Sequence, residues 1–298
     1  MAATTSPSVA LQPLARHRRN QGTWAKRVLQ TRLAVPASLI LLVAVAWALF
    51  ANVLAPYDPS YQDYNSVLMV PSRAHLLGTD DLGRDVLSRI IFGSRISLSV
   101  GLVAVGLAVA IGVPLGLVAA YNRGWIDDVL MRVMDAVSSI PALILALSIT
   151  VALRPGIQNV MIAIAVVYTP AFARLARGEA LSVRERDYIS AARLLGVGPV
   201  RLIGRHILPN VTAPILVLAS LRVATAIVTE ASLSFLGAGV PPPAASWGGM
   251  LKTSYQYTET APWLAIMPGV AIVLTVIAIN IIGDALRTAL DPRMRGRG

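Results

Sequence analysis

Residues 96–122 read ISLSVGLVAVGLAVAIGVPLGLVAAYN, 27 residues without a charged side chain. An α-helix rises 1.5 Å per residue, so about 20 apolar residues cross the roughly 30 Å hydrocarbon core of a bilayer. The stretch is too long and too uniformly apolar for a barrel strand, in which polarity alternates. It therefore predicts a membrane-spanning helix.

Five further stretches of comparable character surround it. Charge-free runs cover residues 33–57, 136–153, 155–173 and 260–283, and a fifth stretch, 211–236, is interrupted only by Arg222 and Glu230. The whole chain is 55% hydrophobic and 14% charged, whereas soluble domains carry about a quarter charged residues. The sequence thus predicts an all-α integral membrane protein with six transmembrane helices.

The net charge of +11 is distributed unevenly over the predicted loops. Of 26 lysines and arginines, 19 fall on the side of the two termini, six fall on the opposite side, and Arg222 lies in a span. Because basic loops stay in the cytoplasm, both termini are expected to be cytoplasmic. This orientation accounts for the basic excess, so no nucleic-acid partner is inferred.

Three regions follow from this pattern. Residues 1–28 form a basic cytoplasmic tail, expected to contact anionic membrane lipid; residues 29–95 contain the first transmembrane helix and a long outer loop; and residues 96–298 hold the other five spans. The third outer loop contains Pro241 to Pro243 followed by Trp247, which predicts a stiff turn and an aromatic side chain at the membrane surface.

Metal and thiol chemistry find little support in the sequence. The chain has no cysteine, and its three histidines, at positions 17, 75 and 206, fall on both sides of the predicted membrane. We expect no metal site.

In the second span, Gly112 and Gly116 form a GxxxG pair that allows close helix packing, inside the chain or between subunits.

The polar segment 174–210, between the fourth and fifth spans, contains DYISAARLLGVGPVRLIGRHILPN from Asp187 to Asn210. Tyr188, Ala191, Ala192 and Leu195 recur at helical spacing, which predicts a short helix with an apolar face that glycines then stop. A second helix is expected over 199–206, with Pro209 ending it. On these grounds alone, docking to another protein and packing against its own domain are equally good interpretations.

This segment resembles the signature of permeases of ATP-binding-cassette importers: E-A-A, three residues, Gly, nine residues, then I-x-L-P. Here Ser190, Ala191 and Ala192 are followed at the same spacing by Gly196 and by His206 to Pro209. Ser replaces the leading Glu, and His stands at the Ile position. Residues 75–95, 229–237, 246–251 and 283–293 are similar to the dipeptide, oligopeptide and nickel branch, and to the second of its two paired permeases.

The resemblance implies a type I ABC-importer permease fold in the bacterial cytoplasmic membrane, with 96–298 as the permease core. The partners it implies are a second homologous permease, two ABC ATPase subunits or one fused ATPase, and an extracytoplasmic solute-binding protein. The implied function is a translocation pathway for di- or oligopeptides, with nickel chelates and glutathione as alternative substrates. The implied ATPase-coupling residues are Tyr188, Ser190, Ala191, Ala192, Arg193, Leu195 and Gly196.

The sequence contains no G-x-x-x-x-G-K-[ST] phosphate loop. ATP and Mg²⁺ are therefore expected on partner ATPases, and this chain is expected to be non-catalytic and without a cofactor. A secondary transporter or a membrane enzyme, the other classes, would require convergent polar residues with repeated halves, or a nucleophile and base motif. We find neither.

Charged residues within a span are functional candidates. Arg222 and Glu230 are eight residues apart, about 12 Å of helix rise, so they are not an adjacent pair. Glu230 is expected to serve a structural or gate role, or to contact substrate. Together with Ser234, these two residues are the candidate residues of a pathway or gate.

Overall fold

The computed structural model describes residues 33–290. Within this range the regular elements are helices, and the one β-type contact is the isolated bridge between Thr79 and Asp85. In order they are α2 (Ala34–Leu54), α3 (Val86–Asn122), α4 (Gly124–Ser138), α5 (Ala142–Leu153), α6 (Ile157–Arg184), α7 (Asp187–Leu194), α8 (Pro199–Leu202), the π-helical segment η1 (Ile203–Ile207), α9 (Leu208–Phe235), α10 (Trp247–Ser254), the 3₁₀ segment η2 (Tyr255–Tyr257) and α11 (Trp263–Leu290).

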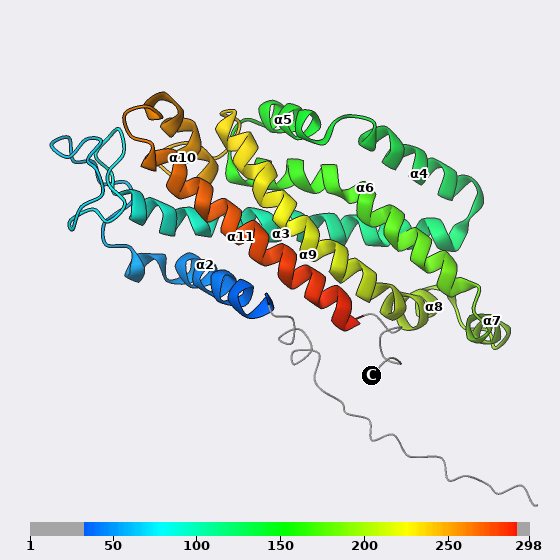
Figure 1. Ribbon diagram of the computed structural model, residues 1–298. Helices are drawn as coiled ribbons and strands as arrows, with labels where there is room; N and C mark the ends of the chain where they lie inside the picture. Colours follow the sequence, from blue (N-terminus) through cyan, green and yellow to red (C-terminus); the bar gives the residue numbers. More distant parts are fainter. Residues whose placement is uncertain (1–32, 291–298) are drawn as a thin grey trace, which may run out of the picture.

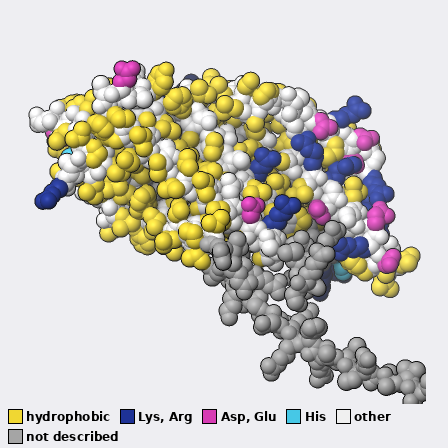
Figure 2. Space-filling model, in the orientation of Figure 1, with side chains coloured by type: hydrophobic (Ala, Val, Ile, Leu, Met, Phe, Trp, Pro, Cys, Tyr) yellow, Lys and Arg dark blue, Asp and Glu magenta, His cyan; other side chains and the backbone are white. Residues whose placement is uncertain are grey.

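The long helices form one elongated bundle (Figure 1). The 55–85 loop and α10 lie at one end, which we call the α10 end, and α7 and α8 lie at the other, the α7 end. On the face shown in Figure 2, hydrophobic side chains cover most of the body, and charged side chains gather toward the α7 end. This is the surface expected of a chain whose middle lies in hydrocarbon.

Five helices are long and apolar enough to cross a membrane: α2, α3, α6, α11 and the continuous run from Pro199 to Phe235. A sixth span is reached when α4 and α5 are counted as one. The predicted all-α membrane fold is confirmed.

The third predicted span, 136–153, is wrong as a single straight helix. The chain bends by 89° between α4 and α5. Pro141 stands at this bend as the residue before α5. Because proline lacks an N–H and disfavours a helical conformation at the preceding residue, here Ile140, the helix is interrupted. The 12 residues of α5 span about 18 Å, less than a hydrocarbon core.

Ion pairs fix α4 against α6. The guanidinium of Arg177 donates twice to the carboxylate of Asp127, at 2.5 and 2.6 Å. Arg174 donates to Asp135 at 3.1 Å and to the hydroxyl of Ser138 at 2.9 Å. Because α4 is polar on this side, its position depends on these contacts rather than on apolar packing alone.

The two glycines of the GxxxG pair lie where α3 contacts α6. A Cβ atom at Gly112 would lie 2.6 Å from the carbonyl oxygen of Thr169, and one at Gly116 would lie 2.9 Å from the Cβ of Ala176 and against the carbonyl oxygen of Ala173. The two backbones therefore touch because neither position has a side chain. The pair serves packing inside the chain.

Replacing Gly116 with Ala should push α3 away from α6 and destabilise the protein by about 1–3 kcal/mol, the usual cost of overpacking. The matched control is Gly106→Ala on the same helix, where nothing lies within 4 Å of the added Cβ. Because alanine favours helix over glycine, the control should be neutral or stabilising. Thermal unfolding in detergent measures both, and an unchanged midpoint for Gly116→Ala would contradict this packing.

Candidate functional site

Helix α7 is anchored to the bundle by one side. Ile189 is fully buried and Ala192 nearly so, both in the main hydrophobic cluster. The helix ends in a Schellman motif: the N–H of Gly196 donates to the carbonyl of Arg193 at 2.9 Å, and that of Val197 to Ala192 at 3.1 Å. Gly196 has φ of +78°, a left-handed conformation that favours glycine. The predicted helix and its glycine stop are confirmed.

The opposite side of α7 is apolar and exposed. Leu194 and Leu195 are 90% and 84% exposed, and Val200 on α8 is 85% exposed. Tyr188 and Ala191 also face outward. Of the four residues of the predicted apolar face, Ala192 is buried against the bundle, and Tyr188, Ala191 and Leu195 are exposed. The other predicted coupling residues, Ser190, Arg193 and Gly196, are exposed as well.

The sequence reasoning missed Ile189, the residue that anchors α7. Its spacing of three from Ala192 was visible in the sequence. However, this short segment offers two apolar stripes, and spacing alone does not say which of them the bundle covers.

The helix that follows α7 does not stop at Pro209. It runs from α8 through η1 into α9, and the N–H of Leu208 donates to the carbonyl of Ile203, five residues back. The prediction that Pro209 ends it is wrong, because the π-helical turn just before Pro209 shifts the hydrogen-bond register by one residue and the helix continues through the proline. One continuous helical run thus leads from Pro199 to Phe235.

Polar contacts tie the α7 region to its neighbours. The amide of Asn210 donates to Tyr188 at 3.3 Å and to the carbonyl of His206 at 2.7 Å. Arg184, in the last turn of α6, donates to the carbonyls of Ala120 and Tyr121 at the end of α3, both at 2.8 Å. The position of α7 is therefore fixed relative to α3, α6 and α9.

At the α10 end, the carboxyl group of Glu230 is fully buried. The hydroxyl of Ser97 on α3 donates to it at 3.1 Å, and that of Ser234, one turn along α9, at 2.8 Å. Ser246, the N-cap of α10, lies 3.5 Å from Ser234 through its own hydroxyl. Buried polar atoms are stable only when paired, so this group holds α3, α9 and α10 together.

Trp247 lies inside the protein rather than at the membrane surface. It is 1% exposed, and its indole N–H donates to the carbonyl of Ile90 at 3.0 Å. A Cβ at Gly93 would lie 2.8 Å from the indole ring, and one at Gly248 would lie 2.5 Å from the Cα of Ala231. The prediction of an interfacial aromatic is wrong, because Gly93 leaves room for the ring and Gly248 lets α10 approach the backbone of Ala231 on α9.

Arg222 is separate from this buried group. Its guanidinium carbon lies 5.2 Å from the ring centre of Tyr168 on α6, which is a cation–π contact. The Tyr168 hydroxyl lies 3.0 Å from that of Thr229. As predicted, Arg222 and Glu230 are not an adjacent pair, and Ser234 joins Glu230 rather than Arg222.

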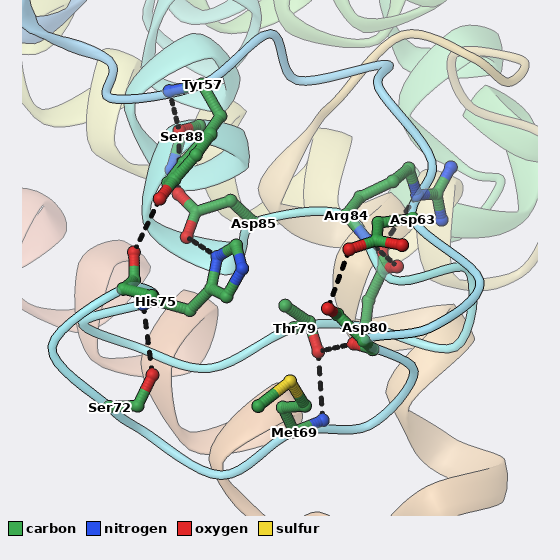
Figure 3. Close-up of polar contacts among 12 residues, drawn as sticks. Tyr57, Asp63, Met69, Ser72, His75, Thr79, Asp80, Arg84, Asp85 and Ser88 are labelled. Carbon is green, nitrogen blue, oxygen red and sulfur yellow. Dashed lines mark hydrogen bonds and ion pairs between the residues drawn. The ribbon is translucent and has the colours of Figure 1, made fainter.

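The 55–85 loop is held by its own polar side chains (Figure 3). Asp85, the N-cap of α3, accepts from the N–H and hydroxyl of Ser88 at 2.8 and 2.6 Å and contacts His75 Nδ1 at 3.1 Å. Ser88 in turn accepts from the N–H of Tyr57 at 3.0 Å. The start and the end of the loop therefore meet at the first turn of α3.

A second group fixes the middle of the loop. Asp80 accepts from the backbone N–H of Arg84 at 3.0 Å and from its Nε at 2.7 Å, and Arg89 Nε lies 3.5 Å from the same carboxylate. Burial raises the pKa of the neighbouring Asp81 carboxyl, and the charge of Asp80 adds to this effect. The loop is an ordered cap on the α10 end.

The fold and these two ends define a multi-pass α-helical membrane protein with an exposed apolar helix at one end and a buried polar cluster at the other. The chain belongs to the family of binding-protein-dependent transport system inner membrane components, whose profile matches residues 112–296. The N-terminal TM domain of oligopeptide transport permease C matches residues 21–71. The resemblance to ABC-importer permeases is confirmed, and membership implies, in general, a partner permease and ATPase subunits.

Curated relatives match nearly the whole chain. A glutathione transport system permease protein of Pectobacterium atrosepticum is 42% identical over 291 residues, 96% of this chain and 97% of its own. A di/tripeptide transport system permease protein of Pseudomonas aeruginosa is 44% identical over 268 residues, 88% of each chain. An inward-facing structure of the MetNI methionine ABC transporter matches 69% of this chain and 98% of its own, with a TM-score of 0.58 and 20% identity, which shows the shared fold.

Replacing Glu230 with Ala should leave the hydroxyls of Ser97 and Ser234 unpaired in a buried space. We expect a loss of about 1–3 kcal/mol in stability, the usual cost of unpaired buried polar groups. Glu230→Gln keeps one carbonyl acceptor and should lose less than half of this. Thermal unfolding in detergent measures both, with the exposed Glu259→Gln as the control. A Glu230→Ala protein as stable as the wild type would remove Glu230 from a structural role.

Proposed function

We propose that this chain is a permease subunit of an ATP-driven importer of di- or oligopeptides. With a second homologous permease it forms the translocation pathway. The observation that carries the proposal is the outward face of α7, where Leu194 and Leu195 are almost wholly exposed on a helix that is fixed from behind.

Two exposed leucines on one short helix are unfavourable in water. Burying each in a partner contributes about 1.5–3 kcal/mol. Arg186, at the start of the helix, and Arg193, next to Leu194, are exposed and keep the rest of the helix soluble. This combination fits docking into an apolar cleft of an ATPase, because the chain leaves the leucines uncovered and itself lacks a phosphate loop.

The distribution of charge sets the orientation in this proposal. With the α7 end in the cytoplasm, the loops on that side hold most of the basic residues. ATP and Mg²⁺ are then bound and hydrolysed by the partner ATPases, two subunits or one fused chain, and not by this chain. The α10 end, which the 55–85 loop covers, then faces the outside of the cell, where a solute-binding protein delivers its bound solute.

The continuous run from Pro199 to Phe235 offers the mechanical connection. A displacement of α8 passes along η1 and α9 to the buried carboxyl group at the α10 end, because the run is helical throughout, and α7 contacts this run through Tyr188 and Asn210. Closure of the ATPases would thereby rock the spans between inward and outward openings.

Docking is tested by a cross-link from Leu195→Cys to the ATPase in the assembled complex. The native chain has no thiol, so the thiol-reactive end of a bifunctional thiol–amine reagent attaches at this position alone within the permease chain. We expect a permease–ATPase product from Leu195→Cys and none from Ile189→Cys, because Ile189 is fully buried. An assembled complex that yields no product from Leu195→Cys would contradict docking through α7.

The substrate is tested by ATP hydrolysis of the complex in lipid nanodiscs with its solute-binding protein. We expect stimulation when the binding protein is loaded with a dipeptide. Glutathione is the second candidate, because a 42% identical relative carries that name. A nickel chelate is the third arm. Stimulation by the chelate alone would contradict a peptide importer, and uptake driven by an ion gradient without ATP would contradict the ATP-driven class.

A further inference from the structure

Helix α9 carries a polar stripe within the membrane. Arg222, Thr225, Thr229 and Ser232 follow one another at spacings of three, four and three residues, which places them on one face. Thr225 is exposed and the other three are half-buried, whereas Glu230 lies buried on another side of the same helix. A polar face in lipid is unfavourable, so this face requires either a partner or water.

The hydroxyl groups of the stripe have already used their hydrogens. Thr225 donates to the carbonyl of Arg222 at 3.0 Å, Thr229 to that of Thr225 at 2.9 Å, and Ser232 to that of Val228 at 2.9 Å. The Thr229 oxygen lies 3.0 Å from the Tyr168 hydroxyl and uses one lone pair there, and the oxygens of Thr225 and Ser232 keep both of theirs. The stripe therefore offers hydrogen-bond acceptors along its length.

Arg222 adds a positive charge midway along the 28-residue helix. Within residues 33–290, no carboxylate lies within ion-pair distance of its guanidinium, and its identified contact is the Tyr168 ring. The ring covers one face of a guanidinium whose five N–H donors remain in its plane. An anion, bound through two N–H groups at once, is the partner that this geometry fits.

An apolar hollow adjoins the stripe toward the α10 end. It measures about 400 Å³ and is lined by Val228, Ser232 and Phe235 of α9, with Leu143 and Ile272 facing them. Val228 lies six residues beyond Arg222, about 9 Å of helix rise. An extended peptide of two or three residues spans the same length.

We propose that this face of α9 is a binding site for the transported solute. Arg222 binds a solute carboxylate, the threonine and serine oxygens accept from its N–H groups, and the hollow receives an apolar side chain. The inference rests on the proposed import of amino-acid-derived solutes. The inference goes further because it names Arg222 as the residue that binds the solute carboxylate. Both dipeptides and glutathione have such a carboxylate.

The test uses Thr225→Cys, one turn from Arg222, in the assembled complex in nanodiscs, with the wild-type complex as background because this chain has no thiol. Two reagents of similar shape are compared, anionic methanethiosulfonate ethylsulfonate and the cationic ethyltrimethylammonium analogue. We expect the introduced thiol to react with both. The anion-to-cation rate ratio should fall about tenfold with Arg222→Gln, because a nearby charge concentrates anions. Arg222→Lys should keep the ratio, and so should Arg132→Gln, which removes an exposed arginine of α4.

Two results would overturn the site. Failure of the Thr225→Cys thiol to react with either reagent means that the face meets lipid or is sealed by the second permease. A ratio that does not change with Arg222→Gln means that an acidic group of the second permease already neutralises the guanidinium. Alanylalanine should slow the reaction with the anionic reagent more than its C-terminal amide does, without binding protein present, and equal effects would remove the carboxylate assignment.

These outcomes are separable from the proposed function. Stimulated ATP hydrolysis in the wild-type complex reports the importer by itself. Its absence would reject the proposed function whatever the reactivity of the introduced thiol, and normal stimulation with an unchanged rate ratio would reject the Arg222 site alone.

Discussion

Hydrocarbon offers no hydrogen bonds, so a polar group at membrane depth must find its partner within protein or in a water-filled path. The bundle follows from this constraint. Backbone groups pair within helices, and the serine and threonine hydroxyls of α9 return to carbonyls of their own helix. Glu230 is buried only together with two serines that donate to it. Arg222 is the exception to this pairing. Its guanidinium lies over the Tyr168 ring, and among the described residues no carboxylate lies within ion-pair distance of it.

Prolines show how differently the chain meets this constraint. Pro141 interrupts the helix and the chain turns by 89°. Pro209 interrupts nothing, because the preceding π-helical turn moves the hydrogen-bond register by one residue. The first outcome separates α4 from α5, and the second keeps α8, η1 and α9 in one run. That continuity is what joins the α7 end to the middle of the membrane.

Sequence patterns were sufficient for the local features. Charge-free length predicted the long helices. The glycine at position 196 predicted the end of α7, and the structure shows why, because this residue has a left-handed φ of +78°. Sequence patterns did not predict the tertiary contacts. Which side of α7 is covered depends on Ile189 meeting the bundle, and the burial of Trp247 depends on Gly93, 154 positions earlier in the chain. Ser97 likewise reaches Glu230 from 133 residues away. No spacing rule encodes such pairs, because they arise only when the helices have packed.

The two charged residues of α9 therefore have different consequences for the molecule. Glu230 binds three segments into one unit at the α10 end, so a movement of α9 there must carry α3 and α10 with it. Arg222 is held by one aromatic contact and is free to change its surroundings as the helix moves. Between them lie two turns of helix without a flexible joint. In the proposed importer, the same run that carries motion from the ATPase thus carries an anion-binding face in its middle. A shift of α9 relative to α6 would take Arg222 away from Tyr168, and solute binding and helix position would be coupled through that one contact.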